Sequence, residues 1–140
     1  MAEFDQTRIA HLTMIQGVIT RMAGNSFALK TLAVTLTTGV VALLGAIQKP
    51  SPLYTLAAVL PIVIFWWLDA RYLQLERLYR RLYDDVREGK VDDAFCMDVR
   101  AYRDQVDSVV RIAASWSVIG IYVALLCVLT IVAAAMLSRG

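Results

Sequence analysis

The chain has 140 residues, of which 59% are hydrophobic, and a mean hydropathy of +0.59. Soluble domains average about 45–50% apolar residues, and the excess here lies in three blocks, so the composition excludes an ordinary soluble globule and indicates a single-domain membrane protein. The net charge is only +2, and nine of the fourteen Lys and Arg lie among ten of the twelve acids between positions 69 and 111. This mixture predicts a solvated helical surface and no binding of nucleic acid.

The first predicted element is an amphipathic helix over residues 5–24. Such a helix lies flat on a membrane surface or packs as the third helix of a small bundle, and the weakly basic polar face favours the bundle. Gly24-Asn25-Ser26 then predicts a break, a kink or a new helix start. The apolar face carries Ile9, Leu12, Ile15, Ile19 and Met22.

Residues 27–47 and 53–69 are predicted as two antiparallel transmembrane helices joined by a short turn with two prolines. Lys30 lies one turn from the end of the first span, where we expect its ammonium group to snorkel to the membrane interface. Three threonines of the first span either pack against neighbouring helices or line a polar pore: Thr31, Thr35 and Thr38.

Tryptophans mark the predicted membrane interface. Trp66 and Trp67 end the second span, and Trp116 lies near the start of the third span, residues 112–137. Asp69 lies two residues after Trp67 and is expected to pair with Arg71 or with a neighbouring helix. Basic residues gather in the N-terminal segment and in residues 70–111, so the positive-inside rule predicts both in the cytoplasm and the C-terminus outside.

Residues 70–111 are predicted to form a cytosolic helical hairpin, with Gly89 ending its first arm and Asp92 or Asp93 starting the second. The apolar residues of both arms follow the three-and-four spacing of packed helices. Because one hairpin does not cover them all, we expect further copies of the chain to bury the rest. The predicted seam of the bundle and oligomer consists of Tyr72, Leu75, Tyr79, Leu82, Val86, Phe95, Val99, Tyr102, Val106 and Val109.

The sequence does not indicate an enzyme. His11 is the only histidine, and the chain has no CxxC, HExxH or glycine-rich phosphate loop. We therefore expect no catalytic residues, no metal ligands and no cofactor. The first hairpin arm carries Arg77, Arg80 and Arg81, which either form ion pairs within the helix or bind an anionic ligand. The expected ion pairs are Glu76 with Arg80, and Arg77 or Arg81 with Asp84 or Asp85.

The segments Met14–Lys30 and Phe65–Arg77 resemble a widespread group of small bacterial membrane proteins, some of them akin to the RipA-like octameric membrane protein family. The layout of the spans is also similar to SLATT-type effectors of nucleotide-signalling defence systems, which are usually described with two spans where this sequence predicts three. These resemblances imply a homo-oligomer in the bacterial inner membrane that forms a pore as an effector, and they carry no catalytic residues.

The sequence thus predicts an all-α membrane protein with three transmembrane helices, a cytosolic helical hairpin and an N-terminal amphipathic helix that completes a small bundle. The predicted function is that of a non-enzymatic homo-oligomer in the lipid bilayer, a channel-like effector gated by a ligand or protein partner at the cytosolic bundle, in bacterial defence or stress. The alternative is a scaffolding membrane subunit that conducts nothing and recruits a partner through the hairpin.

Overall fold

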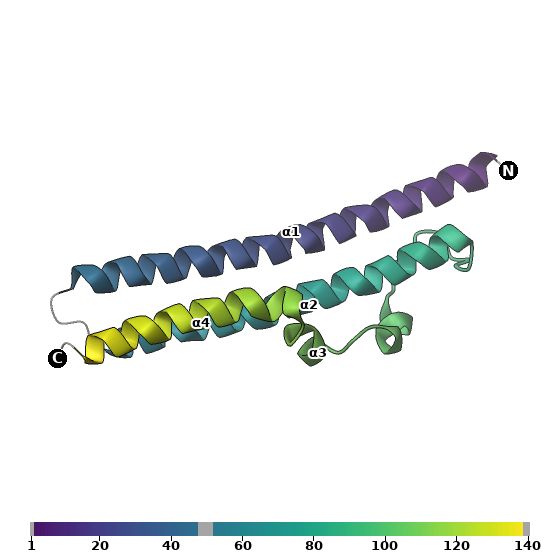
Figure 1. The fold of residues 1–140 in the computed structure, drawn as a ribbon. Helices are drawn as coiled ribbons and strands as arrows, with labels where there is room; N and C mark the ends of the chain where they lie inside the picture. Colours follow the sequence, from purple (N-terminus) through teal and green to yellow (C-terminus); the bar gives the residue numbers. More distant parts are fainter. Residues whose placement is uncertain (1, 48–51, 139–140) are drawn as a thin grey trace.

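The computed structural model describes residues 2–47 and 52–138, which form an elongated helical molecule without a strand in those ranges (Figure 1). Helix α1 (Ala2–Ala46) is followed by the antiparallel helix α2 (Pro52–Glu88). The chain then returns through the 3-10 helix η1 (Arg100–Gln105) and the short helix α3 (Val109–Ala113) to α4 (Trp116–Leu137). The predicted all-α fold is confirmed.

Three helices are long and apolar enough to cross a membrane, namely α1, α2 and α4. Helix α2 runs beside α1, and α4 returns beside the first part of α2 (Figure 1). We call the end of the molecule that contains α4 the apolar half. The polar half consists of residues 6–25 of α1, residues 70–88 of α2 and the return segment, residues 89–113.

Helix α1 is continuous from Ala2 to Ala46, so of the alternatives predicted at Gly24-Asn25-Ser26 a break and a new helix start are wrong. A glycine inside a helix costs only about 1 kcal/mol relative to alanine, and packing against a second helix offsets such a cost. The Ser26 hydroxyl does not cap a new helix but donates a hydrogen bond to Asp69 of α2. The predicted amphipathic helix and the predicted first span are therefore two parts of one rod.

Helix α2 packs against both α1 and α4 in the apolar half. The ring of Tyr122 on α4 is fully buried and stacks on Trp66 of α2, with 6.2 Å between the ring centroids. The small side chains of Ala33 and Ala58 allow the helix backbones to approach closely. The shared core consists of Ala33, Ala58, Ile62, Ala70, Ile112, Val118, Tyr122 and Leu129.

The polar half has a second core, in which the first part of α1 packs against the second part of α2. The predicted N-terminal amphipathic helix is therefore part of a small bundle and does not lie apart from it. Leu78, which lies beside the predicted seam, is covered within the same chain. The buried residues of this core are Ile15, Ile19, Leu78, Leu82, Val86 and Tyr102.

The predicted second arm of the hairpin is not an α-helix, and no helix begins at Asp92 or Asp93. Phe95 has a φ of 65°, which a helix does not allow. Asp98 accepts a hydrogen bond from the backbone N–H of Arg100 at 2.9 Å. Hydrogen bonds that an acidic side chain accepts from nearby backbone N–H groups compete with helix formation, and this stretch is rich in aspartates.

The return segment nevertheless brings most of its seam residues to the core. Val99, Tyr102 and Val106 reach the polar core from η1 and from the extended chain beside it. Phe95 does not, because its side chain is 45% exposed. Of the other predicted seam residues, Leu82 and Val86 are buried, Leu75 and Tyr79 border the polar core, Val109 borders the apolar core, and Tyr72 is half-buried.

The predicted end of α2 at Gly89 is confirmed. Gly89 has a φ of 75°, and its N–H donates to the Val86 carbonyl at 3.1 Å. The next N–H, of Lys90, donates to the Asp85 carbonyl at 2.9 Å, so two of the final carbonyls of α2 are satisfied in the Schellman pattern.

The predicted third span, residues 112–137, is divided at Ser115. Helix α3 ends at Ala113, and α4 begins at Trp116 after Ser115 adopts an extended conformation with a ψ of 146°. The Ser115 hydroxyl donates to the Ile112 carbonyl at 2.6 Å. The apolar helix is therefore the 22-residue α4 alone, and α3 before it belongs to the return segment.

The polar core yields the first prediction. Leu82 is 1% exposed, so Leu82→Ala should lower the free energy of unfolding by about 2–5 kcal/mol and weaken the hydrogen-exchange protection of residues 78–86. The matched control is Val110→Ala, because Val110 is 67% exposed and its truncation should change stability by less than about 0.5 kcal/mol. Equal effects of the two substitutions on protection would contradict the core described above.

Candidate functional site

Three polar side chains meet where α1 and α2 pass from the polar half into the apolar half. The Asp69 side chain is fully buried, and its Oδ2 lies 2.6 Å from the Nζ of Lys30. Its Oδ1 accepts a hydrogen bond from the hydroxyl of Ser26. Lys30 Nζ also donates to Ser26 Oγ at 2.9 Å, which closes a ring of three contacts that we call the crossing cluster.

The crossing cluster compensates a charge that would be costly alone. Burial of an unpaired carboxylate away from water costs several kcal/mol of folding free energy. An ammonium group in direct contact and a hydroxyl donor offset much of that cost. Lys30 retains 24% of its side-chain exposure, so its ammonium also reaches the surface while it holds Asp69. The cluster therefore fixes the register of α1 against α2 at one level.

The partner of Asp69 is on a neighbouring helix, which is one of the two predicted alternatives. Arg71, the other predicted partner of Asp69, donates instead to Gln74 Oε1 at 3.2 Å. The sequence did not predict that the Nζ of Lys30 pairs with Asp69 across the helix pair. The expected reach of the Lys30 side chain to the headgroups stays a prediction. Spacing within one sequence does not show which residues of two antiparallel helices face each other, so this pair could not be assigned from the sequence.

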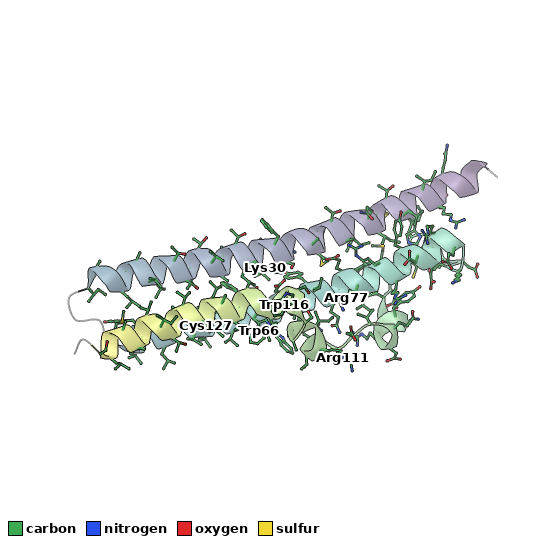
Figure 2. All side chains as sticks on the ribbon, in the orientation of Figure 1. Lys30, Trp66, Arg77, Arg111, Trp116 and Cys127 are labelled. Carbon is green, nitrogen blue, oxygen red and sulfur yellow. The ribbon has the colours of Figure 1, made fainter. Side chains whose placement is uncertain are left out.

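The predicted interface tryptophans lie at the same level as the crossing cluster. Lys30, Trp66 and Trp116 all lie near the middle of the molecule, where α4 begins (Figure 2). Trp66 Nε1 donates to the Ala113 carbonyl at 3.0 Å and so satisfies a free carbonyl at the end of α3. The side chains of Trp67 and Trp116 are 50% and 88% exposed. Amphipathic rings at this level suit the boundary between hydrocarbon and water.

The crossing cluster does not have the geometry of a nucleophile and base. The Ser26 hydroxyl donates a hydrogen bond to Asp69 and accepts one from Lys30, so its oxygen has a charged partner on both sides. Among the described residues, no group of three His, Cys, Asp or Glu is placed to hold a metal ion.

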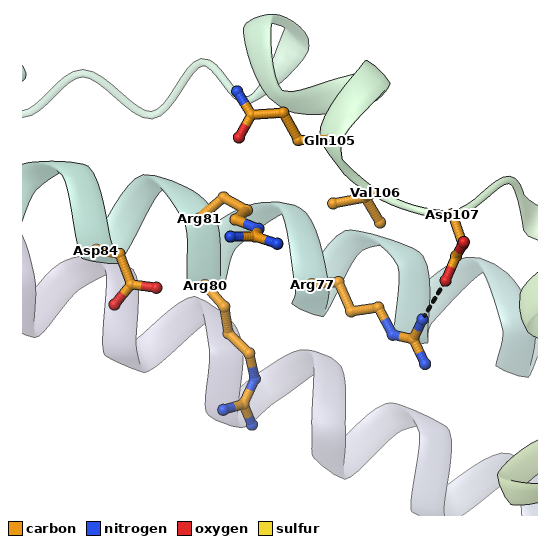
Figure 3. Close-up of a pocket in the computed structure, with 7 residues that line it drawn as sticks. All are labelled: Arg77, Arg80, Arg81, Asp84, Gln105, Val106 and Asp107. Carbon is orange, nitrogen blue, oxygen red and sulfur yellow. Dashed lines mark hydrogen bonds and ion pairs between the residues drawn. The ribbon is translucent and has the colours of Figure 1, made fainter.

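A cavity of about 350 Å³ lies in the polar half, between α2 and the return segment (Figure 3). The predicted arginines Arg77, Arg80 and Arg81 line one wall, together with Asp84. The opposite wall is formed by Gln105, Val106 and Asp107, where the chain leaves η1 in an extended conformation.

The three arginines have different partners. Arg77 pairs with Asp107 across the cavity at 3.1 Å, and Arg80 pairs with Glu76 one turn away at 2.7 Å. The expected pairing of Glu76 with Arg80 is therefore confirmed. The expected pairing of Arg77 or Arg81 with Asp84 or Asp85 is wrong, because Asp84 pairs with Arg87 and Asp85 with Lys90. Arg81 has no ion pair or hydrogen bond with another residue of the described ranges, and its guanidinium points toward the return segment (Figure 3). The cavity thus brings together the arginines that were predicted as contacts for an anion.

His11, which the sequence indicates only as a polar residue of an amphipathic helix, is 3% exposed. Its Nε2 lies 2.8 Å from the Cys96 carbonyl oxygen, and its ring lies 5.9 Å from the ring of Phe95. A second cavity of about 110 Å³ lies beside it, where Arg8 donates to the Val86 carbonyl at 2.9 Å. The N-terminal part of α1 therefore holds the tip of the polar half.

Two groups of the return segment have shifted pKa values with local causes. Burial, with a contribution from Asp85, raises the pKa of Tyr102 to about 12. Hydrogen bonds from Arg100 lower the pKa of Asp98 to about 2. Both groups therefore keep one protonation state over the physiological pH range and serve as fixed structural contacts.

The predicted pore-lining residues Thr31, Thr35 and Thr38 are exposed on α1. Their positions differ by about two residues from those that face α2, such as Ala33 and Thr37, which corresponds to the opposite side of a helix.

Comparison of the chain with protein-family models, with curated proteins and with solved structures gave no match.

The crossing cluster yields the second prediction. Asp69→Leu and Lys30→Met should each destabilise the folded chain by about 3–5 kcal/mol, because each leaves one charge without its partner. The stability of the double variant should be closer to that of the wild type than the stability of either single variant, since two apolar residues pack without an unpaired charge. Thermal unfolding in detergent measures all four proteins. Strictly additive losses would show that the pair does not interact as described.

Proposed function

We propose that the chain is a non-enzymatic membrane protein that assembles from identical copies through one face of α1, and that the assembly has a channel-like path controlled by the polar half. The observation that carries this proposal is a stripe of small residues on the side of α1 that faces away from α2. These residues are spaced alternately by four and three positions and are all exposed: Gly24, Ala28, Thr31, Thr35, Thr38, Ala42 and Gly45.

The stripe differs from an ordinary lipid-facing surface. Large apolar side chains flank it, for example Phe27 at 73% exposure and Leu43 at 63% exposure. Small residues between large ones permit a second helix to approach closely, which is the usual basis of helix association inside a membrane. Spacings of four and three also match the seam of two helices that cross at a small angle.

A second copy of α1 is the partner that this stripe favours. Residues 31–46 carry no charge, so the partner surface is another apolar span. Identical chains in a closed ring present the same residues to each other around a common axis, and a stripe that runs along the whole span suits such an arrangement. The seam residues of the polar half do not supply an equivalent surface, because most are covered within one chain.

The threonines of the stripe support a channel-like path. Thr31 and Thr38 donate their hydroxyl protons to the carbonyls of Phe27 and Val34, at 3.1 and 2.9 Å. Their oxygens keep acceptor lone pairs that face outward, as water or a cation in a narrow path requires. Three spans of one chain do not surround a path, so the walls are supplied by several copies.

The unbroken helices explain how the polar half would control such a path. Because α1 and α2 each run without interruption from the polar half into the apolar half, a tilt at one end displaces the other end. The basic residues of the polar half favour its placement in the cytoplasm of a bacterial cell, with the spans in the inner membrane.

The third prediction tests assembly and conduction together. Thr35→Leu adds volume to the stripe and should shift the complex in nanodiscs to a smaller mass, and it should reduce ion flux into liposomes. Val34→Leu is the matched control, because Val34 is exposed beside the stripe and should tolerate the larger side chain. A wild-type monomer would refute the assembly. An oligomer with no flux would refute the path and favour the alternative function of a membrane scaffold.

A further inference from the structure

We propose that the cavity lined by Arg77 and Arg81 is a binding site for the phosphate group of a small phosphorylated molecule. The site is formed within one chain, so this inference goes beyond the proposed function and does not depend on assembly. Its volume of about 350 Å³ lies within the range of about 300–1,000 Å³ that is typical of small-molecule sites.

The arginines on the α2 wall are placed for an anion. Arg77 and Arg81 are one helical turn apart on α2 and line the same cavity, and the Arg77 guanidinium extends toward Asp107 (Figure 3). The planar fork of a guanidinium matches the oxygens of a phosphate and binds them through two parallel hydrogen bonds. Arg81 has no ion pair in the described structure, and its donors are therefore available to a ligand without the loss of an internal contact.

The acidic residues of the cavity are already occupied. Asp107 accepts from Arg77 at 3.1 Å and from Arg111 at 2.9 Å, and Asp84 lies 3.7 Å from Arg87. Two of these partners, Arg87 and Arg111, lie outside the cavity and partly neutralise the negative charges of Asp84 and Asp107. The charge that remains in the cavity belongs mainly to the arginines, and this favours an anion over a cation.

The position along α2 favours a phosphate in solution over a lipid headgroup. Arg77 follows Trp66 by eleven residues, which corresponds to about 16 Å along an α-helix. The headgroup layer extends only about 5–8 Å beyond the hydrocarbon on each side. If Trp66 marks the hydrocarbon boundary, the cavity lies beyond the headgroups on an upright helix.

A ligand in this cavity would connect α2 to the return segment. Val106 packs against both the polar core and the apolar core, and Asp107 accepts a hydrogen bond from Gln74 through its carbonyl at 3.1 Å. A phosphate that competes with Asp107 for Arg77 would therefore loosen one contact of the return segment and replace it with another. The segment leads directly through α3 into α4.

The test is calorimetric titration of the full-length chain in a neutral detergent with inorganic pyrophosphate. We expect binding that weakens as salt is added, and at least roughly tenfold weaker binding for Arg81→Gln. Arg103→Gln is the matched control, because Arg103 is exposed on η1 outside the cavity and its loss changes the net charge equally. Pyrophosphate should also protect the amides of residues 105–107 from hydrogen exchange.

A second measurement separates the two sources of a phosphate group. The wild type, Arg81→Gln and Arg103→Gln are reconstituted with phosphatidylglycerol, and retained lipid is counted by native mass spectrometry. If the wild type does not bind pyrophosphate, and only Arg81→Gln loses the retained lipid, the site binds a lipid phosphate. If Arg81→Gln and Arg103→Gln behave alike in both measurements, the cavity is not a phosphate site. Because Arg81 has no ion pair in the described ranges, its substitution leaves the fold intact and keeps this comparison valid.

Discussion

The contact between Lys30 and Asp69 is the constraint on which the rest of the structure depends. A buried carboxylate has few acceptable neighbours, so the helix that carries Lys30 is held at one rotation and one height against α2. That rotation directs Ile15 and Ala33 inward and leaves Thr31, Thr35 and Thr38 on the opposite side. The inner core and the exposed stripe thus have the same physical origin. The level of the cluster, beside Trp66 and Trp116, also divides the molecule into its two halves.

The two halves solve different physical problems. In the apolar half, alanines and a stacked Trp66–Tyr122 pair bring three helices close together, as packing inside a membrane requires. In the polar half, leucines and valines are buried away from water between two helices and an irregular return segment. The shared helices α1 and α2 make these halves one mechanical unit. Binding in the cavity of the polar half and packing of the exposed stripe are therefore linked by rigid elements and by the return segment.

The sequence predicted the features that depend on local periodicity and composition. The presence of three long apolar helices, the end of α2 at Gly89 and the role of Leu82 and Val86 in the bundle follow from spacing and turn chemistry, and these agree with the structure. The predicted helix of the second hairpin arm was wrong: Asp98 accepts a hydrogen bond from the nearby backbone N–H of Arg100, and such local bonds compete with a helix even where the apolar spacing suits one. The division at Ser115 was missed for a similar reason, since one extended residue leaves no periodic signal.

The candidate sites were predicted in part. Arg77, Arg80 and Arg81 were recognised from α2 alone, but the wall that encloses them comes from Gln105, Val106 and Asp107, whose path depends on tertiary packing. The pairing of Lys30 with Asp69 and the burial of His11 likewise depend on which faces of two helices meet. Such facts are set by the register between distant segments, which a single sequence does not encode in its local pattern.

The central claim is that the exposed stripe of α1 is the surface on which copies of the chain meet. Disulfide cross-linking in native-like bilayers tests it most directly, with single cysteines placed in a background where Cys96 and Cys127 are replaced. The account predicts cross-linked dimers and larger species for Ala28→Cys, Thr35→Cys and Ala42→Cys, and little cross-linking for Leu36→Cys and Leu43→Cys, which lie about 100° away around the helix. Equal cross-linking on both faces, or none at the stripe, would contradict it.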